Sequence, residues 1–144
     1  MAAYRDRDEM VEIFSMLAER AASSQAARKL HDAKMVVSFV YRNPDLVLVM
    51  DGRTPGDAEP PMAMRFDVSE PTPDVTFECS ADVGHQFWLG KLDVPMALGR
   101  GIVKARGPIA KALKLLPMMP PLYAAYRELM EERGTQGGAG GARP

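Results

Sequence analysis

Apolar residues recur along this chain with two different periods, one typical of helices and one typical of strands. From Met10 to Ala21 they recur every three or four positions, which predicts an amphipathic helix. Asp6 and Glu9 precede it with the spacing of a capping box, so we expect the helix to begin there. A polar, alanine-rich run over residues 23–34 predicts a second helical piece with little share in the core.

Strand signals come next. Residues 35–41 are rich in β-branched and aromatic side chains, residues 46–50 are apolar throughout, and Asn43-Pro44-Asp45 between them predicts a hairpin turn. Two segments with strict alternation follow, 62–68 and 75–79. We predict that these two are neighbours in an antiparallel sheet, with one side facing solvent.

The period then becomes helical again. Ser80 is expected to cap a helix that ends near Lys91, and Asp93 to start another. A last strand over 101–106 precedes helical patterns that begin at Pro108 and at Leu122, separated by a proline-rich break. The pattern predicts one α+β domain over residues 1–133 and a disordered, glycine-rich tail over 134–144.

Composition excludes several classes of function. The chain has 144 residues and a net charge of −1, so no strong field attracts nucleic acid. Its single cysteine, Cys79, cannot form an internal disulfide and suits a reducing compartment. No apolar stretch approaches the roughly 20 residues of a membrane span, and no secretory signal pattern follows the start. We therefore expect a cytoplasmic protein without stable membrane insertion.

The sequence offers little catalytic chemistry. The two histidines are His31, expected to be exposed, and His85, which stands three residues after Asp82 and could share a hydrogen bond with it. No nucleophile or metal-ligand spacing accompanies them, and no glycine-rich phosphate loop is present. We predict no catalytic residue, no metal and no cofactor. A basic cluster (Lys104, Arg106, Lys111 and Lys114) is interpreted as a solvated face or as a partner for an acidic head group.

Two dense apolar runs are more informative. Residues 87–98 and 113–123 are too apolar all round for helices that cover one face of a sheet, so they either fill a large core or line a cavity.

Part of the chain resembles the sterol carrier protein type 2 family. The resemblance rests on Gly90-Lys91-Leu92-Asp93, Ala97, a short strand between Gly101 and Gly107, and Ala112-Leu113-Lys114-Leu115. It implies a five-stranded, mostly antiparallel sheet covered by helices, with an apolar tunnel between the layers that binds a fatty acid, acyl-CoA or sterol. The expected ligand-binding residues are Phe77, Phe87, Trp88, Leu92, Met96, Leu98, Ile102, Leu113, Leu116, Met118, Met119 and Tyr123.

A second interpretation is a module with a filled core. Such a module would associate with a lipid- or steroid-degrading enzyme through Met118, Met119, Leu122 and Tyr123. Under either interpretation Cys79 continues the apolar side of its strand, so we expect it to be buried.

Overall fold

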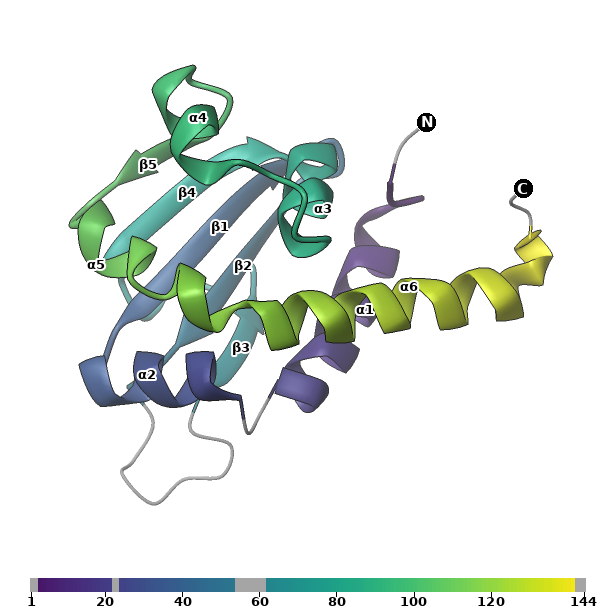
Figure 1. The fold of residues 1–144 in the computed structure, drawn as a ribbon, viewed down its shortest axis with the longest axis horizontal. Helices are drawn as coiled ribbons and strands as arrows, with labels where there is room; N and C mark the ends of the chain where they lie inside the picture. Colours follow the sequence, from purple (N-terminus) through teal and green to yellow (C-terminus); the bar gives the residue numbers. More distant parts are fainter. Residues whose placement is uncertain (1–2, 22–23, 54–61, 142–144) are drawn as a thin grey trace.

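The computed structural model describes residues 3–21, 24–53 and 62–141, which form one sheet with helices over it (Figure 1). The helices are α1 (Arg7–Ala21), α2 (Gln25–Ala33), α3 (Ala81–Trp88), α4 (Val94–Gly99), α5 (Ile109–Leu113), the short 3₁₀ helix η1 (Leu116–Met118) and α6 (Pro120–Gly141). The strands are β1 (Val36–Arg42), β2 (Leu46–Asp51), β3 (Ala63–Phe66), β4 (Val75–Ser80) and β5 (Lys104–Arg106).

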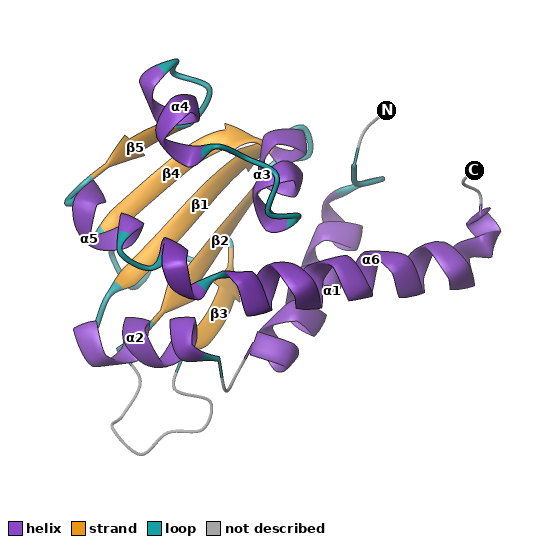
Figure 2. Ribbon diagram, viewed as in Figure 1, coloured by secondary structure: helices purple, strands orange, loops and turns teal. Residues whose placement is uncertain are grey.

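The five strands form one open sheet in the order β3-β2-β1-β4-β5 (Figure 2). β1 and β2 form the predicted antiparallel hairpin, with Tyr41 opposite Leu46. The β2–β3 and β4–β5 pairs are also antiparallel, whereas β1 and β4 run parallel. The predicted α+β architecture with a mostly antiparallel five-stranded sheet is confirmed.

The prediction that the two alternating segments are neighbours is wrong. β3 and β4 lie on opposite sides of the β1–β2 hairpin. Alternation specifies which side chains share a face of a strand, but it does not specify which strand lies alongside. The parallel pairing places Phe39 opposite Phe77 and Tyr41 opposite Cys79, so β1 and β4 together present one continuous apolar face.

Four buried aromatic rings fix three helices to one end of this face. Phe14 of α1 stacks on Tyr41 with ring centroids 6.0 Å apart, and Trp88 of α3 lies 5.9 Å from Phe14. Tyr126 of α6 completes the cluster at 6.3 Å from Trp88. Because these contacts gather around the Tyr41 end of β1, the remainder of the β1–β4 face is left to other elements.

The helix starts follow the capping residues in the sequence. Asp6 Oδ1 accepts a hydrogen bond from Glu9 N at 2.9 Å, which is the first half of the predicted capping box. Glu9 Oε1 accepts from Arg5 N, one residue before the N-cap, so the reciprocal bond of the box is not formed. Ser80 caps α3 through Val83 N, and Asp93 Oδ1 caps α4 through a 3.1 Å bond.

Two elements differ from the sequence prediction, one in how much it buries and one in where it begins. α2 buries Ala26, Ala27 and Leu30 and so contributes more to the core than predicted, and His31 is half-buried rather than exposed. The last strand begins at Lys104, because residues 101–103 form the turn that leaves α4.

The chain from 108 to 121 changes direction twice, as its prolines predict. α5 ends at Leu113, η1 follows, and α6 begins at Pro120. Proline lacks a backbone donor and crowds the preceding turn, which prevents one continuous helix here.

The end of α6 extends beyond the domain boundary that the sequence predicts. Its helical backbone continues to Gly141, because each residue added to an existing helix gains one hydrogen bond. The stretch from 134 to 141 contains five glycines, each less favourable in a helix than alanine by about 1 kcal/mol. The domain boundary at 133 and the disordered tail over 134–144 stay predictions, and residues 142–144 lie outside the described residues.

Candidate functional site

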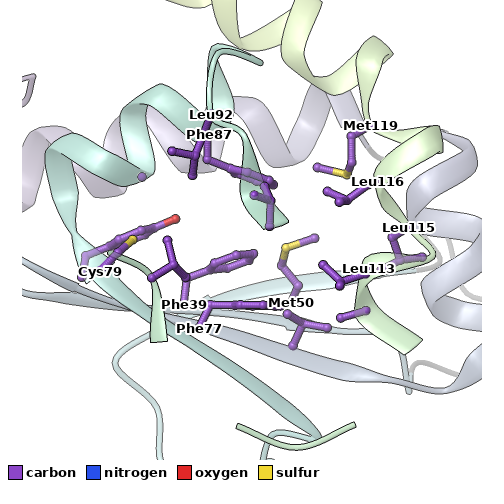
Figure 3. Close-up of a pocket in the computed structure, with 16 residues that line it drawn as sticks. Phe39, Met50, Phe77, Cys79, Phe87, Leu92, Leu113, Leu115, Leu116 and Met119 are labelled. Carbon is purple, nitrogen blue, oxygen red and sulfur yellow. The ribbon is translucent and has the colours of Figure 1, made fainter. Parts of the chain in front are cut away.

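An apolar cavity lies between the β1–β4 face of the sheet and the chain that runs from α3 to the start of α6 (Figure 3). Its volume is about 70 Å³. The residues that line it are Val37, Phe39, Tyr41, Met50, Phe77, Cys79, Gly84, Phe87, Leu92, Val94, Val103, Ala112, Leu113, Leu115, Leu116 and Met119.

Strand side chains form the floor of the cavity. Phe39 and Phe77 stack side by side with ring centroids 5.7 Å apart, and both keep some exposed surface although they lie on central strands. The lining extends along β1 from Val37 to Tyr41. The four residue steps from Val37 to Tyr41, at about 3.3 Å each, give a length of about 13 Å. The floor of the cavity is therefore elongated along β1.

Two separate segments form the opposite wall. Phe87 and Leu92, from α3 and the link to α4, lie on one side, and Leu113, Leu116 and Met119 lie on the other (Figure 3). The proline-containing turn between α5 and α6 directs this second group toward the sheet. Phe87 and Leu92 on one side, and Leu113 and Leu116 on the other, are all half-buried. Met119 is buried.

The lining residues with a side-chain hydroxyl or thiol, Tyr41 and Cys79, are uncharged at neutral pH. Tyr41 Oη accepts a hydrogen bond from Trp88 Nε1 at 3.0 Å, and burial raises the pKa of the Tyr41 hydroxyl well above its usual value. Burial also raises the pKa of the Cys79 thiol to about 11. A molecule in this cavity would therefore contact an apolar surface that presents no charged side chain.

Half of the twelve predicted ligand-binding residues line this cavity: Phe77, Phe87, Leu92, Leu113, Leu116 and Met119. Trp88 lies outside the lining, fully buried behind Phe87 at a centroid distance of 5.1 Å. Leu98, Met118 and Tyr123 pack against the core outside the cavity. Met96 and Ile102 lie at the surface, 37% and 41% exposed.

Apart from Phe77, the strand side of the cavity was not predicted from the sequence. Val37, Phe39 and Met50 line the cavity from β1 and β2 and are not among the predicted ligand-binding residues. Val37 and Phe39 alternate along β1 and so share one face, but the opposite wall determines whether that face is packed or open.

The surface predicted for docking to an enzyme is not free. Met119 and Leu122 are 5% and 2% exposed, and Tyr123 packs its ring edge-on against Phe87 at 5.7 Å. These side chains hold the start of α6 against the rest of the molecule.

His85 belongs to a chain of hydrogen bonds outside the cavity lining. Its Nδ1 lies 2.7 Å from Tyr126 Oη, which in turn lies 2.5 Å from Tyr4 Oη. Asp82, the partner suggested by the sequence, instead accepts a bond from Ala3 N. Burial lowers the pKa of His85 and raises those of Tyr4 and Tyr126. The arrangement links the N-terminal segment, α3 and α6.

Within residues 3–21, 24–53 and 62–141, no three His, Cys, Asp or Glu side chains gather as a metal site requires. None of the helices in this part of the chain combines the length and the apolar character that crossing a bilayer demands.

Comparison with family models and with curated protein sequences gives no match. Solved structures do match. The sterol carrier protein domain 2 of Helicoverpa armigera superposes with a TM-score of 0.59 at 18% identity, over 85% of this chain and 94% of that one. A possible sterol carrier protein from Thermus thermophilus gives 0.58 at 18% identity, over 82% and 86%.

A segment of a larger enzyme has the same fold. The sec-alkylsulfatase Pisa1 from Pseudomonas sp. superposes with a TM-score of 0.52 at 22% identity over 64% of this chain, and this chain spans 14% of that enzyme's length. At such identities the similarity concerns the fold alone. The chain has the fold of sterol carrier protein 2 domains.

Proposed function

We propose that this domain binds an apolar lipid ligand (a fatty acyl chain, an acyl-CoA or a sterol) in the cavity over β1 and β4, and that it performs no chemistry of its own. The observation that carries the proposal is an open, uncharged cavity on the central strands, where a domain of this size would ordinarily pack its densest core. The shared fold with sterol carrier protein 2 domains supports it.

The energetics suit a long apolar chain. Each buried CH₂ group contributes about 0.8 kcal/mol, so about ten of them supply the roughly 8 kcal/mol of micromolar binding. No polar recognition is required for this affinity. The floor of the cavity offers a matching length along β1.

The cavity must widen to admit a whole ligand. Its volume of about 70 Å³ is roughly half that of an engineered apolar cavity of about 150 Å³ that takes up benzene. The wall built from Leu116 and Met119 is the part we expect to move, because Leu116 begins a short 3₁₀ turn that contains Pro117 and Met119 directly follows this turn. Methionine is unbranched and adapts readily to altered shapes.

The remaining chemistry gives no support for catalysis. His85 is engaged with Tyr126 and lies outside the cavity lining, and the Cys79 thiol inside it stays protonated at neutral pH. A protonated, buried thiol is a poor nucleophile. As part of the same proposal the domain acts in the cytoplasm.

A cavity-filling variant tests the proposal. Ala112 lines the cavity, so Ala112→Leu places three more carbon atoms into it, whereas Ala110→Leu adds the same atoms to an exposed position of the same helix. We expect Ala112→Leu to weaken binding of a fluorescent long-chain fatty acid at least tenfold, and Ala110→Leu to leave it unchanged. Thermal unfolding controls for the fold.

Native mass spectrometry of freshly purified protein identifies the ligand class. A co-purifying lipid supports the proposal. The absence of saturable binding to fatty acid, acyl-CoA and sterol alike would contradict it.

A further inference from the structure

The charge of this chain is distributed very unevenly. Residues 91–118 carry one acidic side chain, Asp93, and six basic ones, a net charge of +5, whereas the whole chain has a net charge of −1. The basic residues are Lys91, Arg100, Lys104, Arg106, Lys111 and Lys114, and all six are exposed. Among the described residues, Arg106 is the one member of this group that forms an ion pair, and its partner is Glu78. Most of this positive charge is available to an external partner.

Two exposed apolar side chains lie within the same segment. Met96 of α4 and Ile102 of the turn before β5 are two of the four large apolar side chains that are exposed in the described part of the chain. The turn between them is unpacked, since a Cβ added at Gly99 or Gly101 would meet no atom within 4 Å. We refer to residues 94–102 as the α4–β5 corner.

The corner and five of the six basic residues belong to α4, β5, α5 or the residues that end these helices, whereas Lys91 lies apart, after α3. β5 is the edge strand of the sheet, and α4, β5 and α5 lie together at the end away from α1 and from both chain termini (Figure 1). The inner side of this segment also forms part of the cavity wall, through Val94, Val103 and Ala112. A partner that met this edge would lie next to the cavity.

We propose that the α4–β5 corner docks on an anionic lipid bilayer. Met96 and Ile102 would enter the boundary between head groups and acyl chains, and the surrounding lysines and arginines would lie at the level of the lipid phosphates. Apolar side chains within a basic surround are what interfacial binding to anionic membranes requires. If the proposed function also holds, docking brings the cavity wall to the source of its ligand.

The small apolar area that Met96 and Ile102 expose favours a membrane over a protein partner. Stable protein interfaces bury about 800 Å² on each partner around an apolar centre. Two separate side chains cannot supply such a centre, whereas a bilayer takes up single apolar side chains one by one. A second copy of this chain would also bring the same +5 segment, so two corners would repel each other.

The test is co-sedimentation of the full chain with phosphatidylcholine vesicles, with and without phosphatidylglycerol. We expect binding only to the anionic vesicles, and we expect it to weaken as salt is added, because added salt screens the lysine and arginine charges. Met96→Asp with Ile102→Asp should weaken binding at least tenfold, and Lys111→Glu with Lys114→Glu about tenfold or more. All four side chains are exposed, so the variants should stay folded.

Matched controls exist in the same chain. Met16 on α1 is 37% exposed, the same as Met96, and Lys29 and Lys34 are exposed lysines at α2. Met16→Asp and the pair Lys29→Glu with Lys34→Glu should bind anionic vesicles as the unaltered chain does. An equal loss in these controls, or full binding by the Met96→Asp and Ile102→Asp variant, would overturn the proposal.

Failure of this proposal and failure of the proposed function can be told apart. Vesicle binding needs no ligand in the cavity, and fatty acid titration needs no vesicle. If the unaltered chain does not bind anionic vesicles, membrane docking is wrong whatever the titration shows. If the corner variants instead convert a dimer into a monomer without affecting vesicles, the corner is an interface between two copies.

Discussion

The indole Nε1 of Trp88 donates a hydrogen bond of 3.0 Å to the hydroxyl oxygen of Tyr41, and both residues are buried. The bond joins α3 to the central strand of the sheet at the end where the cavity closes. Tyr41 lines the cavity while Trp88 lies behind it, so the bond connects the cavity to the core.

Tyr41→Phe should lower the free energy of unfolding by about 1–3 kcal/mol. The variant leaves the buried Trp88 N–H without an acceptor, and an unsatisfied buried donor costs about that much. Urea unfolding measures the change. Tyr123→Phe removes the same atom from a half-buried ring and should change the free energy by less than half as much. Equal effects in the two variants would show that the Trp88 bond contributes nothing.

Gly107→Ala should destabilise the fold far more than Gly101→Ala. Both glycines have a positive φ, at 96° and 74°, where alanine costs about 1–2 kcal/mol. A Cβ at Gly107 would also clash with the backbone carbonyl oxygen of Asp74, whereas Gly101 faces open space. Thermal unfolding of both variants measures the difference. Similar losses would mean that the chain around Asp74 shifts without cost.

Protonation of His85 should destabilise the folded state. Burial holds the pKa of His85 below its usual 6.5, Lys91 lowers it further, and Asp82 opposes the shift. With His85 neutral, Tyr4 can donate to Tyr126 and Tyr126 to His85 Nδ1, so both buried hydroxyls are satisfied.

The sign of the pH dependence follows from the direction of that shift. Below pH 6.5 the unfolded chain binds a proton that the folded chain does not, so stability is complete above this pH. It decreases as the pH falls from 6.5 toward the lowered pKa, and levels off below that pKa. Unfolding at several pH values, compared with His85→Gln, measures the slope. An unchanged slope in the variant would exclude His85 as its source.

Cys79 should react slowly with a charged thiol reagent in native buffer. Its pKa of about 11 leaves about one thiolate in ten thousand at pH 7, and the side chain is buried. Labelling followed by mass spectrometry, before and after unfolding in urea, tests this. Rapid labelling of the folded protein would place the thiol on the other side of β4.

The sequence predicted those features that depend on short stretches of chain. The hairpin at Asn43-Pro44-Asp45 and the helix starts at Ser80 and Asp93 were correct, because turn and cap chemistry acts within a few residues. The neighbours of β4 were predicted wrongly, since its pairing with β1 joins residues almost forty positions apart and leaves no local signal.

The same distinction applies to the cavity. Leu113, Leu116 and Met119 were identified because their segments are too apolar for a surface helix. Met96 lies in an equally apolar run but faces solvent, since α4 buries only Val94 and Ala97. The way an element packs on the sheet decides whether its apolar residues line a cavity or face solvent. The density of apolar residues along the sequence does not determine this packing.

The parallel pairing of β1 with β4 has a consequence for how the protein folds. The β1–β2 hairpin can close within a few residues, but Phe39 meets Phe77 only after a long intervening stretch of chain has been organised. Contacts between residues distant in sequence form slowly, because the entropy of closing the loop is lost before any contact forms. The cavity floor is therefore a late product of folding. If the proposed function holds, a bound lipid would stabilise the domain by mass action on molecules that are already folded.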